Sequence, residues 1–190
     1  MSRDPAAAAA ILSSLAAPED PELVELLGAE VARALREELA ARARRWAAAV
    51  APDRAFEATS LDAARAALHG HAGPVLLAAP DVPGLDTRVA GAALDDLASG
   101  VDVVVGVTHD ARPYLIGLPD IESELADLVE GEFGGGVLTR FAERGLTLGM
   151  VRHERRLATA ADARALAIDP MAPADLAALL RERLGRPRRL

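Results

Sequence analysis

Two short apolar runs constrain the fold of this chain more than any other feature. The runs VLLAA (residues 75–79) and VVVGV (103–107) lack the alternation of apolar and polar residues that marks a half-buried strand. Continuous apolar strands are typical of parallel sheets, in which helices cover both faces. Segments with helical periodicity follow these runs, so we expect an α/β fold: a single-domain, mostly parallel sheet with helices on both faces.

The clearest helical pattern covers residues 19–50. Leu23 and Leu27 begin a series of apolar residues at four-residue steps, and arginines and glutamates fill the other face. Asp20 can cap this helix, and Pro21 suits its first turn. We also expect strands at 74–80, 101–107, 112–118 and 146–151, a weak strand or loop at 51–60, and helices at 60–73, 86–100, 122–130, 135–145, 158–167 and 172–184.

The two ends of the chain carry weaker patterns. An alanine run headed by Pro5 follows one arginine and Asp4, a composition that does not fit a signal peptide. We interpret residues 1–20 as an N-terminal arm or short helix, 21–184 as the α/β domain and 185–190 as a basic tail. The apolar-rich N-terminal helix is a candidate surface for a homo-oligomer.

The composition narrows the possible partners. The chain has 190 residues, no cysteine, and no apolar run near the ~20 residues that a membrane span needs. Disulfides and thiolate metal sites are therefore excluded, and a cytoplasmic location is the default expectation. The formal net charge of −8 opposes nucleic acid and anionic membranes as partners, because a phosphate polymer requires a concentrated positive face.

The basic residues are all of one kind. The sequence contains no lysine, asparagine or glutamine, so all 21 basic side chains are arginines. A phosphate-binding loop built around a lysine is therefore impossible. Recognition of a nucleobase would have to use backbone groups, hydroxyls, carboxylates or arginine.

Charged residues follow two of the predicted strands, and parallel sheets bind ligands at the carboxyl ends of their strands. Asp81 is a candidate metal ligand, and Asp110 is a candidate second ligand or acceptor contact. His109 could act as a proton shuttle, and Arg112 could clamp a phosphate through its forked donors. Ordinary loop roles are the alternative for each, since Asp81 can also bond the amides of its own turn before Pro83.

A cluster of glycines, EFGGGV, is a further candidate. Gly135 and Gly136 open a predicted helix, where backbone amides can bind a phosphate. A flexible turn before the helix explains the same residues equally simply. His69, His71 and His153 do not supply the three or four ligands that zinc requires, so we interpret them as loop residues.

Two motifs carry a resemblance to a known family. The segment DVPGL (81–85) follows the first apolar strand, and RPYLIGL (112–118) forms a later one. Residues 75–118 thereby resemble bacterial GT-A-like transferases, including arsenosugar-biosynthesis-type glycosyltransferases and, more distantly, phospholactate guanylyltransferases. The resemblance implies a nucleotide-diphospho-sugar transferase fold, glycosyl or nucleotidyl transfer from a nucleotide-linked donor, and Mg²⁺ or Mn²⁺ held near Asp81.

The chain departs from this family at three elements. The opening strand and its Gly-Lys-Arg loop are not recognisable, and Asp110-Ala111-Arg112 stands in place of Asp-Gly-Gly. Arg156 and Ala158 stand where a later Asp-x-Asp-Thr motif has its carboxylates, and Arg156 brings a positive charge to a site meant for a cation. Two functions are therefore open: a metal-dependent transferase, or a degenerate relative (a pseudoenzyme) that serves as a binding or assembly protein.

Overall fold

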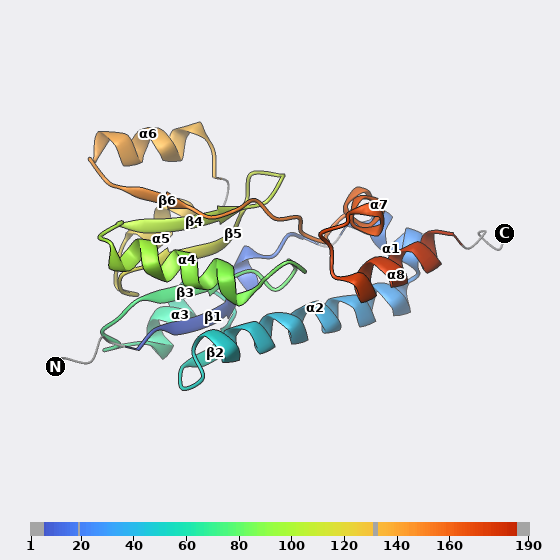
Figure 1. Ribbon diagram of the computed structural model, residues 1–190, viewed down its shortest axis with the longest axis horizontal. Helices are drawn as coiled ribbons and strands as arrows, with labels where there is room; N and C mark the ends of the chain where they lie inside the picture. Colours follow the sequence, from blue (N-terminus) through green and yellow to red (C-terminus); the bar gives the residue numbers. More distant parts are fainter. Residues whose placement is uncertain (1–5, 19, 131–132, 186–190) are drawn as a thin grey trace.

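The computed structural model describes residues 6–18, 20–130 and 133–185, and a six-stranded sheet forms its centre (Figure 1). The strand order is β2-β1-β3-β5-β4-β6, and β5 runs antiparallel to both of its neighbours, β3 and β4. The other five strands share one direction, so the predicted mostly parallel sheet is confirmed. The strands are β1 (Ala8–Leu12), β2 (Ala55–Ala58), β3 (Val75–Ala78), β4 (Val103–Val107), β5 (Pro113–Leu118) and β6 (Leu148–Met150).

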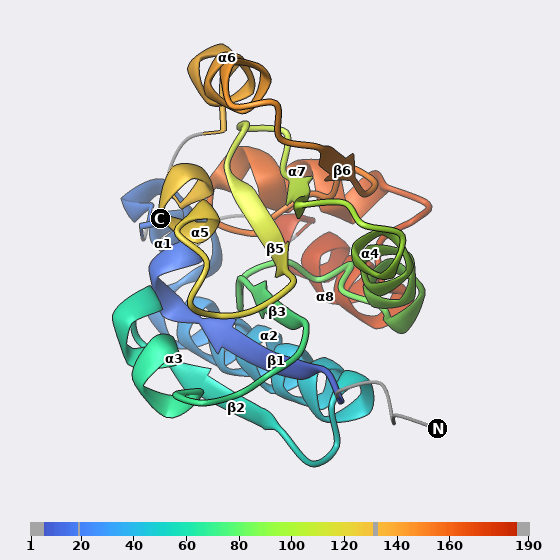
Figure 2. The same cartoon turned by 90° about the vertical axis from the view of Figure 1, so that its left-hand side faces the viewer.

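Helices cover both faces of this sheet. In Figure 2, α2 and α4 lie on one side of the strands, and α3, α5 and α6 lie on the other. Among the described residues, no helix is long and apolar enough to cross a membrane. The α-helices are α1 (Pro21–Leu27), α2 (Ala29–Val50), α3 (Leu61–Ala67), α4 (Thr87–Ala98), α5 (Leu125–Val129), α6 (Gly135–Glu143), α7 (Ala160–Ile168) and α8 (Ala174–Leu184).

The N-terminal segment differs from its expected structure. The interpretation of residues 1–20 as an arm or short helix is wrong for 8–12, which form β1 between β2 and β3, parallel to both. Every residue of β1 is buried. Alanine is a poor strand former by itself, but its small side chain fits where α2 and α3 both approach the strand. The basic tail lies mostly outside the described residues.

The long N-terminal helix is divided in two. Gly28 ends α1 and begins α2, with φ of 84° and ψ of 143°, a conformation that strongly favours glycine. Asp20 caps α1 as predicted, since its carboxylate accepts a hydrogen bond from the amide of Glu22. The apolar periodicity continues across the break because both helices turn their leucines toward one shared core.

That shared core is separate from the core around the sheet. It lies beyond the strand ends, where α1, α7, α8 and the first half of α2 pack together (Figure 1). Its buried members are Leu23, Leu27, Leu35, Leu39, Leu157, Ala163, Leu166, Ala167, Leu176 and Leu180. The second half of α2 contributes Ala43, Trp46 and Ala47 to the sheet core. The helix α2 therefore contributes to both cores.

Candidate functional site

Three chain segments meet at the carboxyl edge of the sheet. Asp81 lies in the turn after β3, and Asp110 lies in the turn after β4. The segment after β6 continues alongside β4, since Thr108 and Glu154 form a parallel bridge and the amide of Glu154 donates to the carbonyl of Val107 at 3.3 Å. This pairing carries the chain on to Arg156, directly between the two aspartates.

The Arg156 guanidinium joins both carboxylates. Its Nη1 lies 3.0 Å from Oδ2 of Asp81, and its Nε lies 3.3 Å from Oδ2 of Asp110. The side chain is only 3% exposed. It also donates to the Oγ1 of Thr108 at 3.3 Å and to the carbonyl of Leu15 at 3.4 Å. The guanidinium thus occupies the space between the carboxylates that the sequence analysis assigned to a cation.

Asp81 is bound on one side only. Its Oδ2 accepts the amide of Ala17 at 2.9 Å in addition to Arg156, whereas Oδ1 is buried and accepts no hydrogen bond from a described residue. Burial raises the pKa of Asp81, and attraction to Arg156 and the Ala17 amide offset that rise only in part. This aspartate therefore ties the loop after β1 to the turn after β3.

The residues present do not fit a divalent cation. Mg²⁺ and Mn²⁺ take oxygen ligands, and a guanidinium has only donors, with no lone pair to offer a metal. A cation between Asp81 and Asp110 would meet the fixed positive charge of Arg156 at contact distance. Within the described ranges, no group of three or more histidine or acidic side chains is arranged to hold a metal. The predicted metal role of Asp81 is therefore not supported by the side chains around it.

A cleft of about 480 Å³ opens beside this cluster. Asp110, Arg112, His109 and Arg155 all contribute to its wall. Arg112 is half-buried and makes no ion pair with a described residue, whereas Arg155 lies 3.9 Å from Asp162. His109 is exposed, with its ring 6.4 Å from that of His153. The structure thus brings three of the predicted residues, Asp110, His109 and Arg112, to one cleft.

The turn that holds Asp110 keeps a glycine-like conformation without a glycine. Ala111 has φ of 59°, in the left-handed region that side chains other than glycine rarely adopt. The amide of Phe133 donates to the carbonyl of Ala111 at 2.8 Å, and the hydroxyl of Thr108 donates to the carbonyl of Arg112 at 2.9 Å. These bonds hold the turn in place although the residue at its apex is an alanine.

The predicted phosphate-binding glycines lie elsewhere. Gly135 and Gly136 are exposed at the start of α6, and neither is among the residues that line the cleft. No heavy atom lies within 4 Å of the Cβ that a substitution would add at either position. The two glycines therefore lie outside this cleft, and their role in binding a phosphate stays a prediction.

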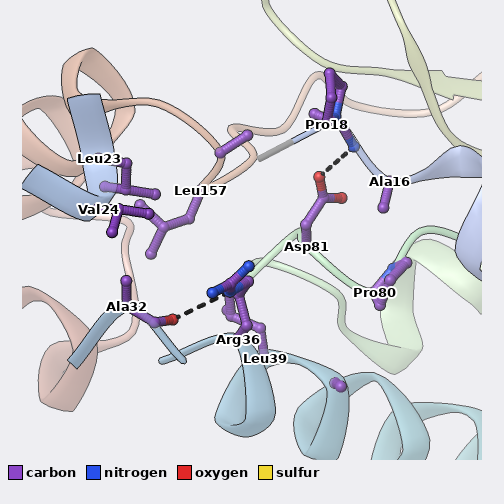
Figure 3. A pocket seen from close by; sticks show the side chains of 13 residues that line it. Ala16, Pro18, Leu23, Val24, Ala32, Arg36, Leu39, Pro80, Asp81 and Leu157 are labelled. Atoms are coloured by element: carbon purple, nitrogen blue, oxygen red, sulfur yellow. Dashed lines mark hydrogen bonds between the residues drawn. The ribbon is translucent and has the colours of Figure 1, made fainter. Parts of the chain in front are cut away.

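A second cavity, with a volume of about 260 Å³, is lined by Asp81 and adjoins this cleft (Figure 3). Its wall is mainly apolar, with Leu23 and Val24 from α1, Leu39 from α2, and Leu157 from the segment after β6. This cavity was not predicted, because Leu23, Val24 and Leu39 have the pattern of one continuous helix and Leu157 lies more than a hundred residues further along the chain. The break at Gly28 is the only local signal that could have indicated it.

The fold of this chain is that of the nucleotide-diphospho-sugar transferases. A protein described as a candidate nucleotide-diphospho-sugar transferase from Desulfovibrio desulfuricans G20 matches with a TM-score of 0.65 over 95% of both chains, at 18% identity. Rv0371c of Mycobacterium tuberculosis in complex with manganese matches with a TM-score of 0.43 at 14% identity, over 86% of this chain and 98% of that one. A 4-diphosphocytidyl-2C-methyl-D-erythritol synthase from Anaerococcus prevotii matches with a TM-score of 0.41 at 11% identity, over 82% and 94%. No protein-family model and no curated protein sequence matches the chain.

Proposed function

We propose that this chain is a catalytically degenerate protein of the transferase fold that binds a phosphorylated, nucleotide-linked small molecule without a divalent cation. The observation that carries this proposal is the Arg156 guanidinium, held between Asp81 at 3.0 Å and Asp110 at 3.3 Å. The guanidinium of Arg156 occupies the position in which a metal-dependent transferase would bind a divalent cation.

The charges at this edge oppose catalysis of transfer from a nucleotide donor. Such a reaction builds negative charge on the leaving phosphate, which a divalent cation normally neutralises. Arg156 is already shared between the carboxylates of Asp81 and Asp110. Arg156 is therefore not free to neutralise a departing phosphate as a divalent cation would.

Binding of a phosphorylated ligand does not require the charge of Arg156. Arg112 is half-buried in the cleft wall, and its guanidinium makes no ion pair with a described residue. An arginine fork matches the oxygens of a phosphate and can replace a metal as the binding charge. The cleft of about 480 Å³ lies within the range that holds small-molecule ligands.

Metal-dependent glycosyl or nucleotidyl transfer is the competing function. It is supported by the shared fold, which also belongs to the protein described as a candidate nucleotide-diphospho-sugar transferase. It would require Arg156 to leave the carboxylates before a cation could bind. The two functions therefore differ in whether ligand binding depends on the metal.

The test is thermal and calorimetric titration with uridine, guanosine and thymidine diphosphosugars and with nucleoside triphosphates, each in MnCl₂ and in EDTA. We expect at least one ligand to stabilise the protein equally in both buffers, by about 2.7 kcal/mol at a hundred times its dissociation constant. Arg112→Ala should remove this stabilisation. Arg144→Ala, which alters an exposed arginine at the end of α6, should retain it.

Two results would contradict the proposal in different ways. Stabilisation that appears only with Mn²⁺, together with transfer of the donor group, would establish the transferase instead. No stabilisation by any member of the panel would show that the cleft does not bind phosphorylated ligands.

A further inference from the structure

The apolar cavity beside Asp81 is assembled by segments distant in sequence. Leu23 and Val24 lie on α1, Leu39 lies on α2, and Leu157 follows β6, so that this wall is mainly aliphatic, with Arg36 beside Leu39 (Figure 3). Pro18 and Pro80 belong to the opposite side, in the loops after β1 and β3. The cavity therefore lies over the carboxyl edge of the sheet and under α1.

The apolar lining of this cavity, more than its volume, marks it as a candidate site, since other surface pockets of the described residues have volumes of about 230–480 Å³. It is a pocket partly open to solvent, and its wall is formed mainly by aliphatic side chains. An apolar cavity of about 150 Å³ stays dry and binds benzene, whereas pockets for drug-sized ligands begin near about 300 Å³. At about 260 Å³, this cavity matches a molecule larger than benzene and smaller than a typical drug.

The charged groups at the rim are already engaged. Asp81 binds Arg156 and the amide of Ala17 through Oδ2, and its other oxygen is buried beneath neighbouring atoms rather than open to the cavity. Arg36 donates its Nε to the carbonyl of Ala32 at 3.3 Å (Figure 3). Neither side chain requires an ionic partner from a ligand, and an ionic ligand would lose its hydration against aliphatic walls.

The break in the N-terminal helix produces this cavity. If α1 and α2 were one straight helix, Leu23 and Val24 would continue along its axis, away from Pro80. The turn at Gly28 instead folds α1 back over the strand ends. The cavity is partly open to solvent, so a ligand can enter it without movement of α1.

From these observations we propose that the cavity under α1 is a second ligand site, for a neutral molecule of one or two rings. It adjoins the phosphate cleft, since Ala17, Pro18 and Ala158 line both, but Arg112 and Asp110 do not line the cavity and the leucines of its wall do not line the cleft. This proposal does not rest on the proposed function, and either can fail alone.

Indole, tryptamine and indole-3-acetate are suitable probes, since they share one bicyclic ring and differ in charge. We expect indole to bind the wild-type protein saturably, with one site by calorimetry and shifts of methyl resonances by NMR. The two charged analogues should bind more weakly. Binding should persist in Arg112→Ala, which separates this site from the phosphate cleft.

Cavity-filling variants locate the site. Ala40→Leu adds bulk at a wall residue on α2 and should weaken indole binding at least tenfold, because pockets discriminate by about 10–200-fold for a single methylene. Ala48→Leu makes the same change at an exposed position of α2 and should bind indole like the wild type. Val24→Phe fills the cavity from α1 and gives an independent check if Ala40→Leu does not fold.

Three outcomes would overturn the proposal. The first is the absence of saturable indole binding to the wild-type protein. The second is tighter binding of either charged analogue, which would mean that Asp81 or Arg36 recruits an ionic ligand. The third is unchanged indole affinity in both folded cavity-filling variants.

Discussion

Arg156 decides the chemistry at the carboxyl edge of the sheet. Removing one partner from a buried ion pair leaves the other charge uncompensated, which is far more costly than loss of an exposed pair. The side chain of Asp81 is 14% exposed and that of Asp110 is 45% exposed. Loss of Arg156 therefore destabilises the protein mainly by leaving the more buried carboxylate, Asp81, without its ionic partner. Asp81 is also the residue that secures the loop after β1 through the amide of Ala17.

We therefore predict that Arg156→Ala lowers the free energy of unfolding by about 3–5 kcal/mol, measured by urea denaturation. Arg144→Ala, an exposed arginine, should change it by no more than about 0.5 kcal/mol. Arg156→Asp should be destabilised in EDTA and partly restored by Mn²⁺, because the change leaves three carboxylates together. Equal stability of Arg156→Ala and the wild type would show that the guanidinium does not hold this edge together.

Sequence spacing predicted some residues of this site and not the contacts between them. Asp81 and Asp110 were recognisable because each follows an apolar strand, and the structure places both within reach of one guanidinium. Spacing alone did not relate Arg156 to them, because 46 or more residues separate it from either aspartate; the family resemblance placed its charge near the site, and the pairing of β4 with β6 brings it into contact. The sequence indicated that a positive charge was near, without indicating what it touches.

At the scale of elements, the break between α1 and α2 has the largest consequence. Gly28 has φ of 84° and ψ of 143°, so any side chain there is strained even though no atom crowds the position. Helical periodicity did not reveal the break, since the leucines on both sides of it face one core. The periodicity predicted correctly that these leucines are buried, but the structure has two helices in place of the one that was predicted.

This difference leads to a matched pair of glycine variants. We predict that Gly28→Ala lowers the free energy of unfolding by about 1–3 kcal/mol, because of backbone strain. Gly91→Ala, inside α4 with no atom within 4 Å of the new Cβ, should raise it by about 0.4–1 kcal/mol. Guanidinium chloride titrations followed by circular dichroism measure both. If Gly28→Ala is as stable as the wild type, the helix break is not a constraint on the fold.

Two hydrophobic cores, connected by α2, determine whether the whole molecule unfolds as one unit. The sheet core contains Trp46, and the second core, with Leu180 at 1% exposure, joins α1, α7 and α8 to the first half of α2. Because α2 contributes to both, loss of packing in one core should be transmitted to the other. The cavity under α1 and the phosphate cleft both lie near the boundary between them.

We predict that Leu180→Ala lowers the free energy of unfolding by about 2–5 kcal/mol, the usual cost of a buried leucine. Its unfolding followed by Trp46 fluorescence and by far-ultraviolet circular dichroism should give the same midpoint. A fluorescence midpoint that stays at the wild-type value while the circular dichroism midpoint falls would show that the two cores unfold separately.

The sequence by itself determined the class of fold. Continuous apolar runs can be satisfied only by burial on both faces, and the helices between them supply the cover, so the mostly parallel sheet followed from local chemistry. The alanine run of β1 escaped this reasoning, because alanine has little strand preference of its own. Its place in the sheet depends on α2 and α3 packing against it.

Tertiary structure alone decided the character of the site. A carboxylate at a strand end is compatible with a metal, a turn or an ion pair, and these alternatives differ only in what approaches it from elsewhere in the chain. Here a buried guanidinium from beyond β6 fills that position, and a glycine break turns α1 over the same edge. Both depend on contacts between distant segments, which residue spacing cannot specify.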